Sequence, residues 1–116
     1  MIFLKAKEHV LYVLNHELNV DNISTSWHNE KLPYPQITVT QTGNNVLNSH
    51  DNKVDFRVVS IQIDVWSDGN PFFIAEEVEK AMLKHGHVYK DEIEVSEPDV
   101  NRILLEYEVL EKGDDI

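Results

Sequence analysis

The sequence predicts an α+β domain in which an antiparallel or mixed sheet of about four to five strands carries two helices on one face, in the order α-β-β-α-β-β. Two segments place apolar residues three or four positions apart, as amphipathic helices do, while other segments alternate apolar and polar residues, as half-buried strands do. With 116 residues, of which 41% are hydrophobic, the chain is long enough for one core. We therefore expect a single domain over residues 1–116.

The first predicted helix covers residues 3–18 and has about four turns. Lys5, Glu8 and His9 occupy its polar side, and the sequence NVDN at residues 19–22 marks its end. Its apolar stripe is expected to consist of Phe3, Ala6, Val10, Val13, Leu14 and Leu18.

The segment after this helix contains Pro33 and Pro35, which force extended backbone and exclude a helix. We expect residues 22–34 to form a loop with a short edge strand around residues 23–27. The β-branched run at residues 37–40 then predicts a strand. Residues 41–53 (QTGNNVLNSHDNK) are almost entirely polar, and the sequence predicts a long polar loop there.

Residues 54–67 predict a strand whose alternation changes phase. One set of apolar residues (Val54, Phe56, Val58) points to one side, and a second set (Val59, Ile61, Ile63, Val65) points to the other. Two interpretations are open. Either a β-bulge near residues 58–59 turns the second half onto the same core, or the strand is straight and is buried on both faces, one of them by a partner subunit.

The second predicted helix starts after Asn70 as the N-cap, has Pro71 at its first position and stops at Gly86. Acidic residues in its early turns and basic residues in its later turns suit the helix dipole. Its buried stripe is expected to comprise Ile74, Val78, Ala81 or Met82, and His85, with Phe72 and Phe73 as an aromatic start in the core.

Two further strands are predicted at residues 88–95 and 102–110, with a turn at Pro98-Asp99 between them. The second of these strands has the cleaner alternation, with Ile103, Leu105, Tyr107 and Val109 inward. Residues 112–116 are expected to form an exposed tail.

Composition restricts the function classes. The formal net charge is −11, with 21 acidic against 10 basic residues spread along the chain, so we expect no specific nucleic-acid binding; an acidic wall does suit a channel through which DNA slides. The absence of cysteine excludes disulfides, thiolate nucleophiles and cysteine-ligated zinc. Because no apolar stretch reaches the length of a membrane span or a signal-peptide core, we expect a cytoplasmic protein with no membrane partner.

No catalytic, cofactor or metal site is predicted. His85 and His87 lie at a predicted helix end, where a cationic side chain supports the dipole, and His50-Asp51 accompanies no nucleophile motif. Adjacent carboxylates are explained by solvated surfaces, and no phosphate-binding glycine loop is present. The sequence therefore favours a protein that is not an enzyme and needs no cofactor.

Aromatic residues offer candidates for contact with another chain. Trp66, Tyr107 and the two adjacent phenylalanines are expected to lie in the core. Trp27 and Tyr34 differ because they belong to a proline-bearing segment that has little core of its own, and Trp and Tyr are typical interface anchors.

Three stretches together resemble the phage tail terminators, a family of tail-completion or head–tail joining proteins. They are YPQITV at residues 34–39, VSIQIDVWS at residues 59–67 and AEEVEKAML at residues 75–83. In that family a first helix leads to a P-x-I strand, a strand ending in V-W-S, a helix with an A…I/V…L pattern and a final antiparallel pair. The resemblance covers residues 3–111 and lies in the order and spacing of these short motifs.

The resemblance implies a virion structural protein of the tail or neck, assembled in the host cytoplasm into a homo-oligomeric ring, usually of six subunits. Such a ring ends polymerisation of the tail tube protein at its head-proximal end and docks the head–tail connector proteins, with DNA passing through. Candidate subunit contacts are then Trp27, Tyr34, Ile61 and Ile63. Candidate contacts with the tube or connector are Asn44, Asn45, Val46, Leu47 and His50 in the polar loop.

Alternatives stay open. Another neck or minor tail protein, such as an adaptor or stopper, would share these patterns. A small cytoplasmic ligand-binding or regulatory domain with a ferredoxin-like sheet would have the same order of elements and a concave pocket with convergent polar groups. An enzyme would require His50-Asp51 or the His85/His87 pair to converge with a carboxylate.

Overall fold

A computed structural model of the chain describes residues 2–3, 5–25, 27–50, 53–97 and 100–112. The α+β class is confirmed, and so is the order of two helices and four long strands. The elements in order are β1 (Ile2–Phe3), α1 (Ala6–Glu17), β2 (Asn22–Ser24), β3 (Gln36–His50), β4 (Lys53–Ser67), α2 (Phe72–Lys84), β5 (Val88–Glu97) and β6 (Val100–Lys112).

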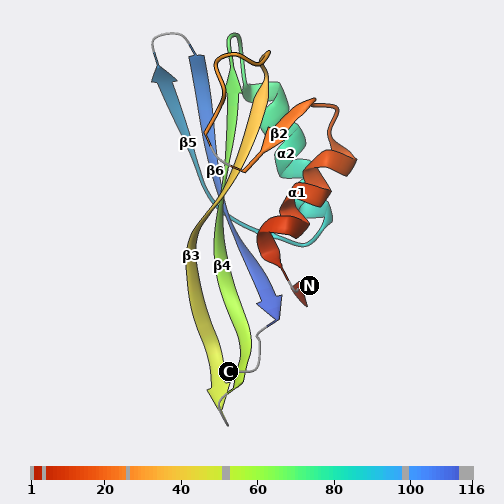
Figure 1. Ribbon diagram of the computed structural model, residues 1–116, viewed down its shortest axis with the longest axis vertical. Helices are drawn as coiled ribbons and strands as arrows, with labels where there is room; N and C mark the ends of the chain where they lie inside the picture. The colour runs from red at the N-terminus through yellow and green to blue at the C-terminus, as the bar shows by residue number, and fades with distance from the viewer. Residues whose placement is uncertain (1, 4, 26, 51–52, 98–99, 113–116) are drawn as a thin grey trace.

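The strands form one mixed sheet in the order β1-β6-β4-β3-β2, with β5 paired to β6 over the part of its edge that β1 leaves open. The four long strands pair antiparallel, whereas β1 with β6 and β2 with β3 are parallel. Both helices cover the same face of this sheet (Figure 1). The other face, called the open face below, carries no helix among the described residues, as the sequence predicts for a two-layer α+β domain.

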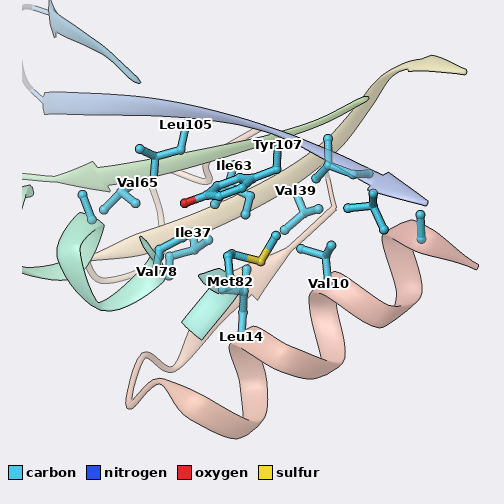
Figure 2. Packing of buried hydrophobic residues seen from close by; sticks show 14 of the residues in the cluster. Val10, Leu14, Ile37, Val39, Ile63, Val65, Val78, Met82, Leu105 and Tyr107 are labelled. Atoms are coloured by element: carbon cyan, nitrogen blue, oxygen red, sulfur yellow. The ribbon is translucent and has the colours of Figure 1, made fainter. Parts of the chain in front are cut away.

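The core fills the space between this sheet and the two helices (Figure 2). Val10 and Leu14 of α1 and Val78 and Met82 of α2 point toward the sheet and are fully buried. The sheet contributes the inward-facing apolar residues of its three central strands: Ile37, Val39, Val59, Ile61, Ile63, Val65, Ile103, Leu105, Tyr107 and Val109. Burial of this much apolar surface is the main force that holds the two layers together.

The apolar stripes of the helices largely follow the sequence prediction, with one exception at the start of α2. Ala81 and Met82 are both buried, and Ile74 is half-buried. Phe72 and Phe73, however, are 45% and 69% exposed, so their placement in the core is wrong. The physical reason is the helical period: the stripe set by the buried residues of α2 leaves the side of the helix at Phe73 in solvent.

The predicted polar loop at residues 41–53 is wrong for residues 41–50 and 53, because these belong to the paired strands β3 and β4. β3 and β4 pair from Gln36 with Trp66 to His50 with Lys53, and residues 51–52 lie outside the described residues. The hairpin extends past the helices at one end of the molecule, whose longest dimension is 51 Å (Figure 1). β3 is largely polar there because no helix covers that part, and Gln41, Thr42 and Asn44 are exposed.

The phase change in β4 is explained by a straight strand. β4 pairs with β6 from Phe56 to Ser67 without a register shift, so the first interpretation, a bulge near residues 58–59, is wrong. The extra residue lies instead in the neighbouring strand β3. Gln41 pairs with Ile61 and Gly43 pairs with Ser60, so Thr42 between them is a bulge residue with no paired position in β4. The inward residues of β4 thus keep one face, and Val58 lies half-buried on the other.

The start of α1 is held by a residue that lies 105 positions away along the chain. The backbone N–H of Ala6 donates to Oε2 of Glu111 at 2.9 Å, and Oε1 of the same buried carboxylate lies 3.8 Å from the guanidinium of Arg57. A carboxylate at a helix N-terminus satisfies an amide that has no partner within the helix and complements the helix dipole.

α2 begins one residue later than predicted, at Phe72, with Pro71 rather than Asn70 as its N-cap. Asn70 Oδ1 nevertheless accepts the N–H of Phe72 at 2.9 Å, and the other end follows the sequence signal. At the other end, His87 N–H donates to the carbonyl of Met82 and Gly86 N–H donates to that of Leu83, while Gly86 adopts φ +80°. This pair of bonds is a Schellman motif, which requires the left-handed backbone that glycine adopts without cost.

A short edge strand follows the first helix, and the last long strand runs further than predicted. The short edge strand expected after the first helix is present as β2, at residues 22–24. Lys112 belongs to β6, while the rest of the predicted tail and the turn at Pro98-Asp99 lie outside the described residues. In the described part of the chain, neither helix has the length and apolar character that crossing a membrane requires.

Candidate assembly surface

An aromatic cluster covers one end of the open face. Trp66 is the residue after the inward-facing Val65, so its side chain lies on the opposite side of the sheet from the core. The segment that follows β2 brings Trp27 and His28 against it, with ring centroids 4.7 Å and 4.1 Å from that of Trp66. The Arg102 guanidinium lies 4.9 Å from the Trp27 ring and 4.7 Å from the Trp66 ring. We call Trp27, His28, Trp66 and Arg102 the aromatic cluster.

Polar groups beneath the cluster fix its rings. Trp66 Nε1–H donates to Thr38 Oγ1 at 3.0 Å, and Arg102 Nε donates to Asp64 Oδ1 at 2.9 Å. The other oxygen of Asp64 accepts a hydrogen bond from Gln62. Because the side chains of Arg102 and Asp64 are only 12% and 3% exposed, this ion pair is largely removed from water and holds the guanidinium in one orientation.

The segment that carries Trp27 is tied to the sheet through Gln36. Its amide donates to the carbonyls of Asn29 and Leu32 and its oxygen accepts the N–H of Asn29, at distances between 2.7 and 3.1 Å. His28 and Tyr34 share a further hydrogen bond of 2.8 Å. Trp27 nevertheless remains 57% exposed, so a large aromatic side chain on a well-anchored backbone faces solvent. Exposed, pre-positioned aromatic residues are the usual anchors of protein interfaces.

The candidate interface residues from the sequence fall into three groups. Trp27 and Asn44 are exposed and Tyr34 is half-buried. Asn45, Val46, Leu47 and His50 lie in β3, and their side chains are outside the described residues. Ile61 and Ile63 are fully buried in the core of the chain itself, so their assignment to a subunit contact is wrong. The helices already cover the face of β4 to which these two residues point.

Sequence reasoning missed His28, Arg102 and the outward position of Trp66. The outward position of Trp66 could have been predicted from the alternation of the strand, because Trp66 is out of phase with the inward-facing residues Val59, Ile61, Ile63 and Val65. His28 and Arg102 gave no such signal, since only the path of the segment after β2 brings them together.

Both sides of the sheet end in long strand edges. β2 covers β3 only from Gln36 to Thr38, and in the described ranges no other strand pairs with the outer edge of β3 along residues 39–50. On the opposite side, β5 pairs with β6, and its outer edge has no strand partner among the residues that the structure describes. Such edges present rows of backbone donors and acceptors to a further strand.

The two edges differ in charge. β5 contains four acidic residues and one lysine, whereas β3 contains no Asp, Glu, Lys or Arg. Two β5 edges placed side by side would bring like charges together, which destabilises cross-strand pairs. Pairing between unlike edges avoids this repulsion.

Three histidines gather where α1 meets the end of α2. The ring centroid of His9 lies 5.9 Å from that of His85 and 5.2 Å from that of His87, and His85 Nε2 lies 3.4 Å from Glu17 Oε1. Burial, with the nearby imidazoles of His9 and His85, lowers the pKa of His87 to about 4, and burial with His85 also lowers the pKa of His9. Hydrogen bonds from Lys84 and His85 lower the pKa of Glu17. Within the described residues, no three His, Asp or Glu side chains are arranged to hold a metal ion.

Comparison of the chain with known protein families finds no family whose model matches it, and comparison with curated proteins finds no match.

Proposed function

We propose that the chain is a structural virion protein that closes into a ring, usually of six copies, at the head-proximal end of a phage tail, where it ends polymerisation of the tail tube and docks the head connector. The proposed role is that of the family that the sequence resembles over residues 3–111. The observation that supports assembly is the presence of two unlike strand edges on opposite sides of one sheet. A ring needs a heterologous interface, in which two different surfaces of each subunit meet head to tail.

The proposed interface joins the β3 edge of one copy to the β5 edge of the next. β5 is ten residues long and the uncovered part of β3 spans residues 39–50, so the two edges are similar in length. Main-chain hydrogen bonds provide the affinity in such strand addition, and the difference in charge between the edges selects the head-to-tail arrangement over β5 with β5. Trp27 lies on the open face against Trp66 of β4, at the end of the sheet where β2 covers β3, and is proposed as a second contact with the neighbouring subunit.

The first experiment measures the mass of the purified protein by light scattering over a concentration series, with negative-stain images of the same samples. Rings of about six subunits are expected, as in the family that the chain resembles. Added tail tube protein should form shorter tubes that carry a ring at one end. If the protein remains monomeric at every concentration and no ring forms on added tubes, the proposal is wrong.

A charge-reversal pair tests the edges. Gln41 and Asn44 are exposed positions of β3, so Gln41→Glu with Asn44→Glu places negative charge opposite the acidic β5 and should abolish the ring. The matched variant, Gln41→Lys with Asn44→Lys, should instead stabilise it. Equal effects of the two variants on the measured mass would exclude this interface.

Trp27 is tested against a second exposed aromatic residue. Trp27→Ala should weaken assembly about tenfold or more, as loss of an interface anchor does. Tyr12→Ala is the control, because Tyr12 is 61% exposed on α1 and stacks on His16 in the adjacent turn. If both variants weaken assembly equally, Trp27 is not an anchor.

A further inference from the structure

A cleft of about 300 Å³ opens between the start of α1 and β3. Its lining includes Lys5, Lys7, Leu11, Thr25 and Gln41. Gln41 pairs with the inward-facing Ile61 across the β3–β4 ladder, so its side chain lies on the helix-covered side of the sheet. The cleft therefore borders the uncovered edge of β3 on the same side as the helices.

The entrance of the cleft carries positive charge. Lys5 is exposed and Lys7 is half-buried, and among the ion pairs of the described residues none involves either lysine. Two acids also line the cleft, of which Glu111 is buried and already bound to the start of α1 and to Arg57. Glu8, the other acid, is outnumbered by the two lysines. The cleft therefore suits an incoming carboxylate.

The opposite edge of the sheet carries carboxylates on the matching side. Glu92 pairs with Leu105 and Glu94 pairs with Ile103, and both partners point into the core. Directly paired residues in neighbouring strands point to the same face. Glu92 and Glu94 therefore project on the helix-covered side, where both are exposed.

The symmetry of a ring aligns these two features. Rotation about the ring axis keeps the helices of every copy on one side, and β3 and β5 run in opposite directions within a copy. An edge of β3 therefore meets β5 of the next copy antiparallel, with Val39 toward Glu97. That alignment places Glu94, near the end of β5, beside Gln41, near the start of the uncovered part of β3.

We propose that Glu94 of one copy enters the cleft of the next copy and pairs there with Lys7. The contact rests on the proposed ring and deepens it, because it defines which positions of the two edges meet. Charge pairs across an interface select register and orientation more than they add affinity. One solvent-accessible pair in each interface contributes little to affinity, so the net repulsion between copies still governs the response to salt.

A charge exchange tests the contact. Lys7→Glu and Glu94→Lys each bring like charges together, and each should raise the dissociation constant of the ring about tenfold or more. The double variant restores an opposite-charge pair in every interface, so its dissociation constant should return to within about threefold of the unchanged protein. Light scattering over a concentration series measures all three. A double variant that assembles no better than the single variants would overturn the contact.

Two controls separate the contact from net charge. Lys80→Glu changes the charge as Lys7→Glu does, but Lys80 lies on α2, is 74% exposed and does not line the cleft, so it should weaken the ring less. Glu77→Lys makes the chain less negative, as Glu94→Lys does, and should strengthen the ring while Glu94→Lys weakens it. Equal effects within either pair would show that net charge alone is responsible.

Chemical cross-linking of the unchanged protein distinguishes failure of the contact from failure of the ring. A mixture of isotope-labelled and unlabelled chains is treated with a carbodiimide, which couples a lysine to a carboxylate in contact with it. Mass spectrometry should find Lys7 joined to Glu94 between a labelled and an unlabelled chain. Rings that lack this cross-link would overturn the contact and leave the ring standing, whereas the absence of rings would overturn the proposed function itself.

Discussion

The indole of Trp66 is fully buried although it lies on the face of the sheet that has no helix. It is buried because one short segment folds over it and because the Arg102 guanidinium packs against its ring. A stacked cation and an indole attract each other more strongly when both are removed from water. The open face therefore has a small ordered core of its own at this end.

Trp66→Phe should destabilise the protein by about 1–3 kcal/mol, because it removes the hydrogen bond to Thr38 and part of the ring that His28 and Arg102 cover. Urea unfolding at pH 7 measures the free energy. Trp27→Phe is the comparison. Because Trp27 is 57% exposed, this variant should lower the free energy of unfolding by less than about 0.5 kcal/mol. Similar losses for the two variants would contradict this account.

His87 makes the free energy of unfolding depend on pH. Its pKa is about 4 in the folded protein against an ordinary value of 6.5, so between these pH values the unfolded chain binds a proton that the folded chain does not. The free energy of unfolding therefore falls as pH decreases through this window, by up to about 3 kcal/mol at its acid end. His9, whose pKa is also lowered, acts in the same direction.

Urea unfolding from pH 8 to pH 4.5 tests this dependence. His87→Gln should remove most of the fall, because the variant has no imidazole to protonate at that position. His16→Gln, which changes an exposed histidine of α1, should keep it. An unchanged slope in the His87→Gln protein would show that other groups cause the pH dependence.

At the scale of elements, the end of α2 depends on one backbone conformation. Gly86→Ala should cost about 1 kcal/mol, since φ +80° strains any residue with a Cβ. Gly69→Ala is the control, because a Cβ there would meet its nearest atom at 3.8 Å and the backbone is not in the left-handed region. Thermal unfolding should show a lower midpoint for Gly86→Ala and little change for Gly69→Ala.

The elements that could be predicted from sequence are those whose residues face one buried layer. α1, α2 and β6 have a periodic apolar stripe, and each was located to within a few residues. The β3–β4 hairpin could not be recognised over residues 41–53, because no helix covers that stretch, so its side chains carry no apolar alternation although residues of β3 as far as His50 pair with β4.

The candidate surface was predictable only in part for a related reason. Trp27 stood out as an aromatic residue in a segment without a core. Ile61 and Ile63 were assigned to a partner because alternation shows that two faces of a strand differ, but does not show which face the chain covers with its own helices.

At the scale of the whole molecule, charge opposes assembly. The chain has a formal net charge of −11, so six copies in the proposed ring would repel one another at low ionic strength. Salt should therefore strengthen ring formation, because the Debye length shortens from about 30 Å at 0.01 M to about 8 Å at 0.15 M. Light scattering between these concentrations measures the change, and a ring that dissociates as salt is added would point to an interface held by ion pairs instead.

The contact between Ala6 and Glu111 joins residues 105 positions apart, and β1 pairs with the same stretch of β6. A ribosome makes the chain from its amino end, so α1 leaves the exit tunnel long before the strand that caps it exists. Such distant pairings are reached late in folding because the loop between them must close first. In a nascent chain, therefore, the first turn of α1 stays uncapped and the sheet beneath the helix stays incomplete until β6 has been synthesised.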